Sequence, residues 1–303
     1  MALYSTLFAF GDSLSDAGNL YAADGGTAPV SPYDAGHFSN GPTWVEDLSG
    51  MLGLGTLTPS LKGGNDFAFG GAQTGTTAIE GLSPIDLPAQ IAEYAVSHPT
   101  PVAGALYTLD IGANDIINAL DDFAAGKISL GGVNTVVIEA ENNTVHAVDA
   151  LYLHGARNLL FYEVPNLGLT PLFEGTSLQG LASGLAHSFD QTVLADVAPL
   201  ERFGLKVFDL HTYALLGEIE RDPAAFGFTN VTTPVWTGNF TSSTPGTLAS
   251  TNPSVQNQYL FWDHLHPTAA GHQLTADFAY DLLTGRPGTS IVGVSHPMAF
   301  SIG

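Results

Sequence analysis

Two short segments at opposite ends of the chain contain residue types that together could perform nucleophilic catalysis. Near the start, Ser13 stands in the string Gly-Asp-Ser-Leu (residues 11–14), directly after an apolar run. Near the end, Asp263 lies three residues before His266. A serine hydroxyl is a weak nucleophile at neutral pH: it needs an adjacent base, which works best when a third group orients it. The chain therefore holds the three parts of a serine hydrolase, which only folding can bring together.

Two further segments offer groups that could stabilise the oxyanion of an acyl-transfer reaction. A glycine turn at Gly71 follows one apolar run, and Asn114 follows another. Such a reaction requires two or three preorganised hydrogen-bond donors. The backbone N–H groups of Ser13 and Gly71 and the side-chain amide of Asn114 would supply three. Glycine suits position 71 because a side chain there would crowd the acyl carbonyl.

The elements that must position these residues are short apolar runs that alternate with helical patterns. Apolar residues with a 3.6-residue period predict helices over 133–152, from 178 to 193 and over 268–283. The alternation predicts an α/β fold, a parallel sheet covered on both faces, with the site beyond the carboxyl ends of its strands. Five runs are predicted to be buried strands: Thr6–Phe10, Asp66–Phe69, Ala105–Asp110, Asn158–Glu163 and Leu205–Asp209.

Together, the four segments resemble the motif blocks of the GDSL lipases and esterases, also called SGNH hydrolases. The matching blocks are Gly-Asp-Ser-Leu at 11–14, the turn at Gly71, Gly-x-Asn-Asp at 112–115 and Asp-x-x-His at 263–266. Any one block is a weak signal, whereas four in the same order are strong. The resemblance spans roughly residues 3–284.

The resemblance implies both a fold and a set of residue roles. The fold is a flavodoxin-like three-layer α/β/α sandwich with a central parallel five-stranded sheet. The activity is carboxylic ester hydrolysis, in which Ser13 is the nucleophile, His266 is the base and Asp263 orients that base. The oxyanion hole is formed by Ser13, Gly71 and Asn114.

The wider string around the serine, residues 8–19, looks like the bacterial secreted branch of the family, which includes autotransporter esterases and lecithinase/haemolysin-type phospholipases. We therefore expect a secreted or cell-surface protein, although this chain shows no signal-peptide pattern. Two departures stand out. Asp66 occupies a position where many relatives have asparagine, and the segment before Asp263 lacks the cysteines that relatives often carry there.

Composition argues against several other classes of protein and kinds of site. The 303 residues include 29 acidic and 7 basic ones, a net charge of −22, so binding to nucleic acid is not expected. No apolar stretch reaches the ~20 residues that span a bilayer, which argues against stable membrane insertion. The absence of cysteine removes disulfides and cysteine–zinc sites. No dinucleotide or P-loop motif appears and the histidines show no metal-ligand spacing, so we predict neither a cofactor nor a metal.

Other interpretations of the same residues stay open at this level. Ser13 and Asn114 could each cap a helix. His264 competes with His266 as the base, although the Asp-x-x-His spacing favours His266. The carboxylates of Asp12, Asp16 and Asp115 are expected to brace turns.

The chain is predicted to form one domain over residues 1–285, followed by a tail over 286–303. Segments 21–42 and 226–258 are breaker-rich and are expected to be long surface loops or, alternatively, the two walls of the substrate cleft. The oligomeric state is not readable from the sequence.

The predicted substrate is a small-molecule ester or lipid with a short- to medium-chain acyl group. Alternatives are a polysaccharide acetylesterase, an acyltransferase that uses the same residues, and a catalytically inert secreted binding module. The preference for acyl chains rests on apolar residues in the expected loops, namely Tyr21, Pro29, Val30, Tyr33, Phe38, Leu167, Leu169, Leu172, Phe173, Val235, Trp236 and Phe240.

Overall fold

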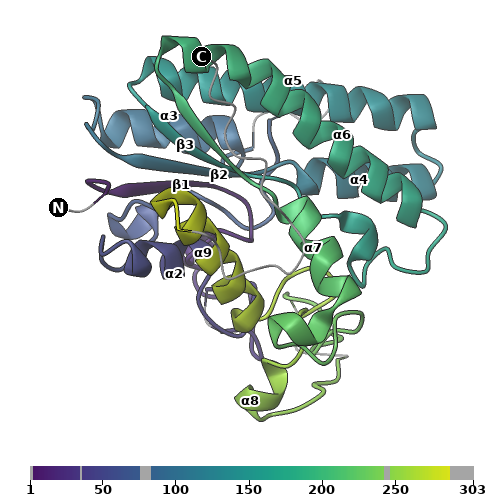
Figure 1. Ribbon diagram of the computed structural model, residues 1–303. Coiled ribbons are helices and arrows are strands. Elements are labelled where there is room, and N and C mark those ends of the chain that lie inside the picture. Colours follow the sequence, from purple (N-terminus) through teal and green to yellow (C-terminus); the bar gives the residue numbers. More distant parts are fainter. Residues whose placement is uncertain (1–2, 35, 76–82, 242–245, 287–303) are drawn as a thin grey trace.

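The computed structural model describes residues 3–34, 36–75, 83–241 and 246–286 (Figure 1). Strands and helices alternate over most of this part of the chain. The strands are β1 (Leu7–Gly11), β2 (Leu106–Asp110), β3 (Asn158–Tyr162) and β4 (Lys206–Leu210). The helices are α1 (Asn19–Ala23), α2 (Trp44–Met51), α3 (Leu87–Ser97), α4 (Ala113–Ala124), α5 (Leu130–Leu153), α6 (Gln179–Val197), α7 (Thr212–Arg221), α8 (Pro253–Gln256) and α9 (Ala269–Thr284). Short 3₁₀ turns are Ser60–Lys62, Leu167–Leu169, Ala198–Phe203 and Pro223–Phe226.

The sheet is parallel throughout, in the order β1-β2-β3-β4. Leu7 pairs with Leu106 between β1 and β2, and Leu159 pairs with Val207 between β3 and β4. The predicted α/β fold with a parallel sheet is confirmed, and each of the four strands lies within one residue of its predicted bounds.

The predicted fifth strand, Asp66–Phe69, is not confirmed: within the described residues the sheet has four strands. This segment still runs beside β1. Phe67 N–H donates to the Ala9 carbonyl at 2.8 Å and Phe69 N–H to the Gly11 carbonyl at 3.1 Å. Its pairing is limited to isolated parallel bridges of Asp66, with Ala9 and with Pro59. The segment lies at the sheet edge and turns away at once through Gly70 and Gly71, so its pairing stays too short for a strand.

Alternate residues along each strand face the two helical layers, because successive side chains of a strand point to opposite faces. On one face, Phe8, Tyr107 and Phe161 belong to a large apolar core shared with α3, α4, α5 and α6. On the other, Leu7 and Leu160 pack with residues of α2 and α9. Figure 1 shows the first group of helices above the sheet and α2 and α9 below it.

The predicted helices correspond to α5, α6 and α9. Segment 226–258 is mostly irregular where it is described, with only the last residue of a 3₁₀ turn and the short α8. Except for Arg286, the predicted tail lies outside the described residues.

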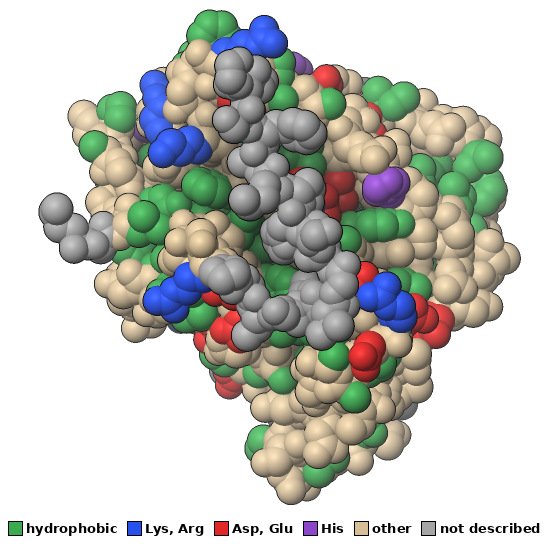
Figure 2. All heavy atoms as spheres, in the orientation of Figure 1, with side chains coloured by type: hydrophobic (Ala, Val, Ile, Leu, Met, Phe, Trp, Pro, Cys, Tyr) green, Lys and Arg blue, Asp and Glu red, His purple; other side chains and the backbone are tan. Residues whose placement is uncertain are grey.

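Charged side chains cover little of the face shown in Figure 2, in keeping with a charged fraction of 12%. Among the described residues, no helix combines the length and apolar character needed to cross a bilayer.

Candidate active site

The site begins where β1 ends. Only glycine fits at position 11, because the backbone of Asp110 lies so close that a Cβ would be 2.2 Å from its carbonyl oxygen. The buried amide of Gln90 holds this strand end, because it accepts from Gly11 N–H at 2.9 Å and donates to Gly11 C=O at 2.7 Å. The chain then turns sharply, as Ser15 N–H and Asp16 N–H both donate to the Asp12 carbonyl. Ser13 is thereby fixed at the carboxyl edge of the sheet.

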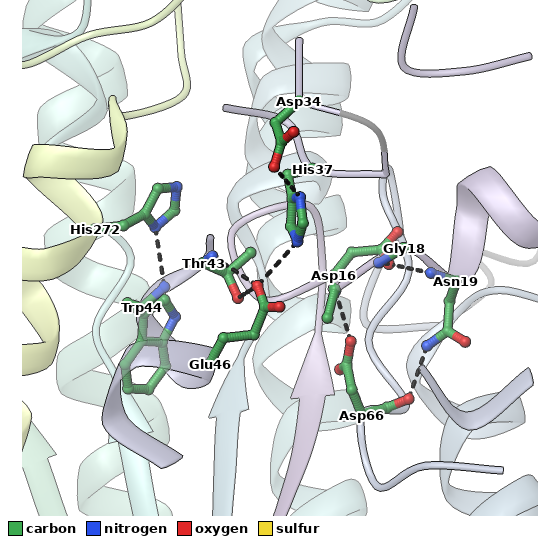
Figure 3. Close-up of polar contacts among 11 residues, drawn as sticks. Asp16, Gly18, Asn19, Asp34, His37, Thr43, Trp44, Glu46, Asp66 and His272 are labelled. Atoms are coloured by element: carbon green, nitrogen blue, oxygen red, sulfur yellow. Dashed lines mark hydrogen bonds and ion pairs between the residues drawn. The ribbon is translucent and has the colours of Figure 1, made fainter. Parts of the chain in front are cut away.

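Two buried carboxylates lock the serine turn to the segment that carries Gly71 (Figure 3). Asp16 accepts backbone N–H groups from Gly18 at 2.7 Å and, across the chain, from Gly70 at 2.7 Å. Asp66 accepts from Ala17 N–H at 2.6 Å. These bonds give Asp16 and Asp66 a bracing role. An asparagine at position 66 would keep an acceptor oxygen, so this departure from the family pattern changes local bonding only.

The Asp-x-x-His segment is a self-contained turn. One carboxylate oxygen of Asp263, Oδ1, accepts from the N–H groups of Leu265 at 2.8 Å and His266 at 2.7 Å. The other oxygen, Oδ2, lies 2.7 Å from His266 Nδ1. The three-residue spacing thus lets a single carboxylate hold both the backbone and the ring of the histidine.

Ser13, His266 and Asp263 form a continuous hydrogen-bonded chain. Ser13 Oγ lies 2.8 Å from His266 Nε2, and all three side chains are buried. His264 is exposed, and its carbonyl accepts from Leu172 N–H. The geometry therefore pairs Ser13 with His266.

The electrostatics of this chain favour an imidazole that readily accepts a proton. Burial alone would lower the pKa of His266, but the charge of Asp263 and its hydrogen bond raise it above the usual value. Burial would raise the pKa of Asp263, but His266 and the donors around the carboxylate lower it. Next to them, burial and the charges of His266 and His37 lower the pKa of His272 to about 3. Asp263 is thus ionised and His272 neutral at neutral pH.

The predicted oxyanion donors other than Ser13 come from two separate segments of the chain. Asn114, in the first turn of α4, borders the same pocket as Ser13. Its side-chain N–H₂ donates to Ala72 C=O at 2.9 Å and to Asp12 Oδ2 at 3.3 Å.

Gly71 follows at the turn after the edge segment, with φ +81°, a conformation that favours glycine. Nothing lies within 4 Å of a Cβ built there. Within the protein, the positive φ alone explains why glycine stands at position 71. The expectation that a side chain there would crowd the acyl carbonyl concerns bound substrate.

An apolar pocket opens beside Ser13 and His266. Its walls come from Pro165 and Leu167 after β3, from α7 and from the strand-like segment before Asp263. Of the apolar loop residues expected to form an acyl site, only Leu167 borders it. The others do not line this pocket, although Phe38 packs against the His266 ring with centroids 5.2 Å apart. The lining apolar residues are Leu14, Ala113, Pro165, Leu167, Leu215, Leu216, Ile219, Leu260, Phe261, Leu265 and Pro267.

Two features of the site were not anticipated from the sequence. Leu215, Leu216 and Ile219 of α7 line the pocket, and their spacing of one and four residues is a helical signal that could have identified this wall. Tyr33 donates from its hydroxyl to Asp263 Oδ2 at 2.6 Å. No sequence signal points to this contact, because 230 residues separate the partners.

Among the described residues, Glu163, Asp209 and His211 offer metal-ligand atoms within 4.8 Å of one another. They stand at the ends of β3 and β4. His211 Nδ1 lies 3.2 Å from an oxygen of each carboxylate. The hydrogen bond to Glu163 raises the pKa of His211 despite partial burial. These contacts are those of an ion-paired histidine.

A buried serine–histidine–aspartate chain at the carboxyl edge of a parallel sheet defines a hydrolase-type site. A family model described as GDSL-like Lipase/Acylhydrolase matches residues 7–279. The chain belongs to this family, as its motif blocks predicted.

Individual relatives carry names that fit this family. Esterase EstA of Pseudomonas aeruginosa is 31% identical over 318 residues, which covers 93% of this chain and 47% of the relative. GDSL esterase/lipase 6 of Arabidopsis thaliana is 26% identical over 88% of this chain and 84% of its own length. This chain thus spans about half the length of some curated relatives, including EstA.

Among solved structures, an acetylxylan esterase from Geobacillus stearothermophilus superposes with a TM-score of 0.51 at 15% identity, covering 93% of this chain and 96% of that one. At this identity the likeness establishes the fold alone.

Proposed function

We propose that this protein is a serine carboxylic ester hydrolase that works through an acyl-enzyme on esters or lipids with an apolar acyl group. The observation that carries the proposal is the 2.8 Å contact between Ser13 Oγ and His266 Nε2 at the mouth of an apolar pocket. Family membership supports the same reaction class.

In the first half-reaction, His266 Nε2 takes the proton from Ser13 as Oγ attacks the ester carbonyl carbon. The carbonyl oxygen becomes an oxyanion, which the N–H groups of Ser13, Gly71 and Asn114 stabilise. The tetrahedral intermediate collapses, the alkoxy C–O bond breaks, and His266 returns the proton to the leaving alcohol. An acyl-Ser13 ester remains.

In the second half-reaction, water attacks the acyl carbon while His266 accepts its proton. The same donors stabilise the second oxyanion, and the proton then passes to Ser13 Oγ as the carboxylic acid leaves. Throughout, the ionised Asp263 stabilises the imidazolium form of His266. No cofactor takes part in this scheme.

The pocket favours an acyl chain longer than acetyl. The helix α7 begins two residues after β4 and runs away from the sheet edge in Figure 1. Thr212 and Ile219 both line the pocket, and their separation along the helix corresponds to roughly 10 Å. Leu215, Leu216 and Ile219 are buried among the apolar side chains of this region. We therefore place a medium-length acyl chain along α7 and rank the acetylesterase alternative second.

The primary test is hydrolysis of p-nitrophenyl esters, from acetate to palmitate, by the wild-type protein and the Ser13→Ala variant. We expect the wild type to turn over with an optimum at medium chain length, and the variant to be inactive. A fluorophosphonate probe should label the wild type and not the variant. Absence of both turnover and labelling in the folded wild-type protein would instead support the binding module.

Chain-length selection is tested by filling the pocket with Ile219→Trp. We expect octanoate hydrolysis to fall by more than about tenfold while acetate hydrolysis stays within about twofold, because a bulky ring shortens the apolar space. Ile138→Trp is the matched control, since Ile138 lies exposed on α5. Equal losses on acetate and octanoate would contradict an acyl chain lying along α7.

We further propose a secreted or cell-surface location, supported by the cysteine-free, glycine-rich and lysine-poor composition. Fractionation of the producing cells tests this proposal, and recovery of the full-length protein in the cytosol alone would contradict it.

A further inference from the structure

Asp263 receives more hydrogen bonds than the Asp-x-x-His turn alone provides. Its Oδ1 is satisfied by two backbone N–H groups of its own turn. Its Oδ2 contacts His266 Nδ1 at 2.7 Å and also accepts the Tyr33 hydroxyl at 2.6 Å. The oxygen that faces the histidine is therefore held from a second side, by a residue from a distant loop.

Tyr33 is itself immobilised. The side chain is buried, and its ring lies edge-on to Trp262 with centroids 5.8 Å apart. Val235 and Trp236 complete the same apolar cluster. The backbone N–H of Tyr33 donates to Val30 C=O at 3.1 Å. The hydroxyl is thus presented to Asp263 by a side chain with little freedom to turn.

The loop that carries Tyr33 is anchored at the adjacent residues as well. Asp34 lies 3.1 Å from His37 Nδ1, and Glu46 of α2 lies 3.0 Å from His37 Nε2 (Figure 3). Further along the loop, Phe38 packs against the His266 ring with centroids 5.2 Å apart. The same loop therefore touches both members of the acid–base pair.

Tyr33 lies outside the substrate pocket, which Ser13 and His266 line. The residue is polar only at its hydroxyl, and that group is aimed at the carboxylate. A role in binding substrate is thus separable from a role in holding Asp263.

We propose that Tyr33 is a positioning residue for the reaction: its hydroxyl fixes the Asp263 carboxylate in the orientation that His266 requires. This inference rests on the proposed ester hydrolase activity. Without the hydroxyl, Oδ2 keeps only the imidazole as its donor. The two N–H groups on Oδ1 still hold the carboxylate, but its orientation is fixed less firmly and the ring is aligned less well with Ser13.

The inference predicts a specific kinetic signature for Tyr33→Phe. We expect kcat to fall roughly tenfold, the order of one hydrogen bond to a charged group. KM should stay unchanged, because Tyr33 does not border the pocket. The acidic limb of the kcat/KM profile should move to higher pH, since a carboxylate with fewer donors holds the imidazolium proton more strongly. Asp12 and His272, the other titratable groups that interact with His266, are unaltered in this variant.

The matched control is Tyr94→Phe. It also removes a buried hydroxyl with a 2.6 Å bond, here to Tyr107, in the core formed with α3. We expect this variant to lose thermal stability to a similar degree while keeping the kcat and pH profile of the wild type.

The outcomes are distinguishable. If the wild type shows no Ser13-dependent turnover, the proposed function itself fails. If the wild type is active and Tyr33→Phe matches Tyr94→Phe in kcat and in pH profile, the positioning role is wrong. A rise in KM at constant kcat would also overturn the inference, because it would place Tyr33 in contact with substrate.

Discussion

Two buried aspartates flank the Ser13–His266 pair, and their surroundings shift their pKa values in opposite directions. Asp263 receives two backbone N–H groups, the His266 ring and the Tyr33 hydroxyl, and its pKa is lowered. Asp12 receives Leu14 N–H at 3.1 Å and Asn114 at 3.3 Å, and its pKa is raised well above the usual value by burial and then by the charge of Asp110.

The difference shows that burial does not decide the charge of a carboxylate by itself. Both side chains are almost completely buried, so desolvation opposes ionisation in both. Four donors, one of which is the His266 ring whose charge also favours ionisation, overcome that cost at Asp263. Asp12 has two donors at longer distances and an acidic neighbour. Asp263 is thus suited to stabilise an imidazolium, whereas ionisation of Asp12 is opposed by its surroundings.

The strongest test of this comparison is Asp263→Asn. An amide at this position removes the charge that stabilises protonated His266 and favours the wrong tautomer of its ring. We expect kcat on the preferred p-nitrophenyl ester to fall on the order of 10³–10⁴ with the fold retained. Circular dichroism checks the fold. A folded variant with near-normal kcat would contradict the role of Asp263.

The next largest effect is expected from Asn114→Ala, which removes the side-chain donor that contacts Asp12. Loss of one oxyanion donor should reduce kcat roughly 10²–10³-fold with little change in KM. Steady-state kinetics on the same ester measure both parameters. Asn142→Ala is a matched control, because Asn142 lies exposed on α5. Near-normal turnover of a folded Asn114→Ala protein would remove Asn114 from the oxyanion hole.

A much smaller effect is expected from Asp12→Asn, although the chemical change equals that at Asp263. If Asp12 is already neutral, an amide preserves its shape and its acceptor oxygen, so kcat should fall by less than about tenfold. Parallel kinetics of the two Asp→Asn variants make the comparison direct. Losses of similar size at the two positions would show that the two aspartates do not differ in charge.

The smallest expected effect concerns stability and pH. Buried carboxyls whose pKa values are raised, such as Asp12, Asp110 and Asp115, bind protons in the folded state at pH values where the unfolded chain has released them. The pKa values of Asp110 and Asp115 are raised to about 7. The raised pKa of His266 acts in the same direction, so stability falls as pH rises from about 4 to 7 and beyond.

Asp263 and His272 act in the opposite sense and reduce the net effect. The lowered pKa of Asp263 contributes stability that is lost only as pH falls below its usual titration range. The pKa of His272, lowered to about 3, makes the folded state lose stability as pH falls below the usual histidine range. We therefore expect thermal unfolding at pH 5 to occur roughly 5 °C above that at pH 8. Calorimetry at constant ionic strength measures this difference. A higher Tm at pH 8 would contradict the raised pKa values.

The features that the sequence predicted well are local or repetitive. The Asp-x-x-His turn is closed by bonds within four residues, so its spacing alone predicted which histidine pairs with Asp263. The strands and the helices α5, α6 and α9 follow from apolar periodicity. The exception, Asp66–Phe69, is apolar like the other runs, but its position at the sheet edge limits its pairing.

The features that could not be predicted depend on which surface an apolar residue meets. Tyr33, Val235 and Trp236 were expected in an acyl site and instead pack around Trp262. Leu216 and Ile219, which went unnoticed, form the pocket wall. Residue type gives the tendency to be buried, but the burial partner is set by the path of the chain.

The sequence by itself determined the family and the α/β architecture and predicted the serine, histidine and aspartate of the proposed active site, because these features are encoded in short motifs and in periodic patterns. Only the tertiary structure decided which apolar side chains line the pocket, that Tyr33 reaches Asp263, and that the pKa values of Asp12 and Asp263 are shifted in opposite directions. The physical reason is the same in each case. A contact between segments more than 200 residues apart, or the balance of burial against donors at one carboxylate, exists only once the chain has folded.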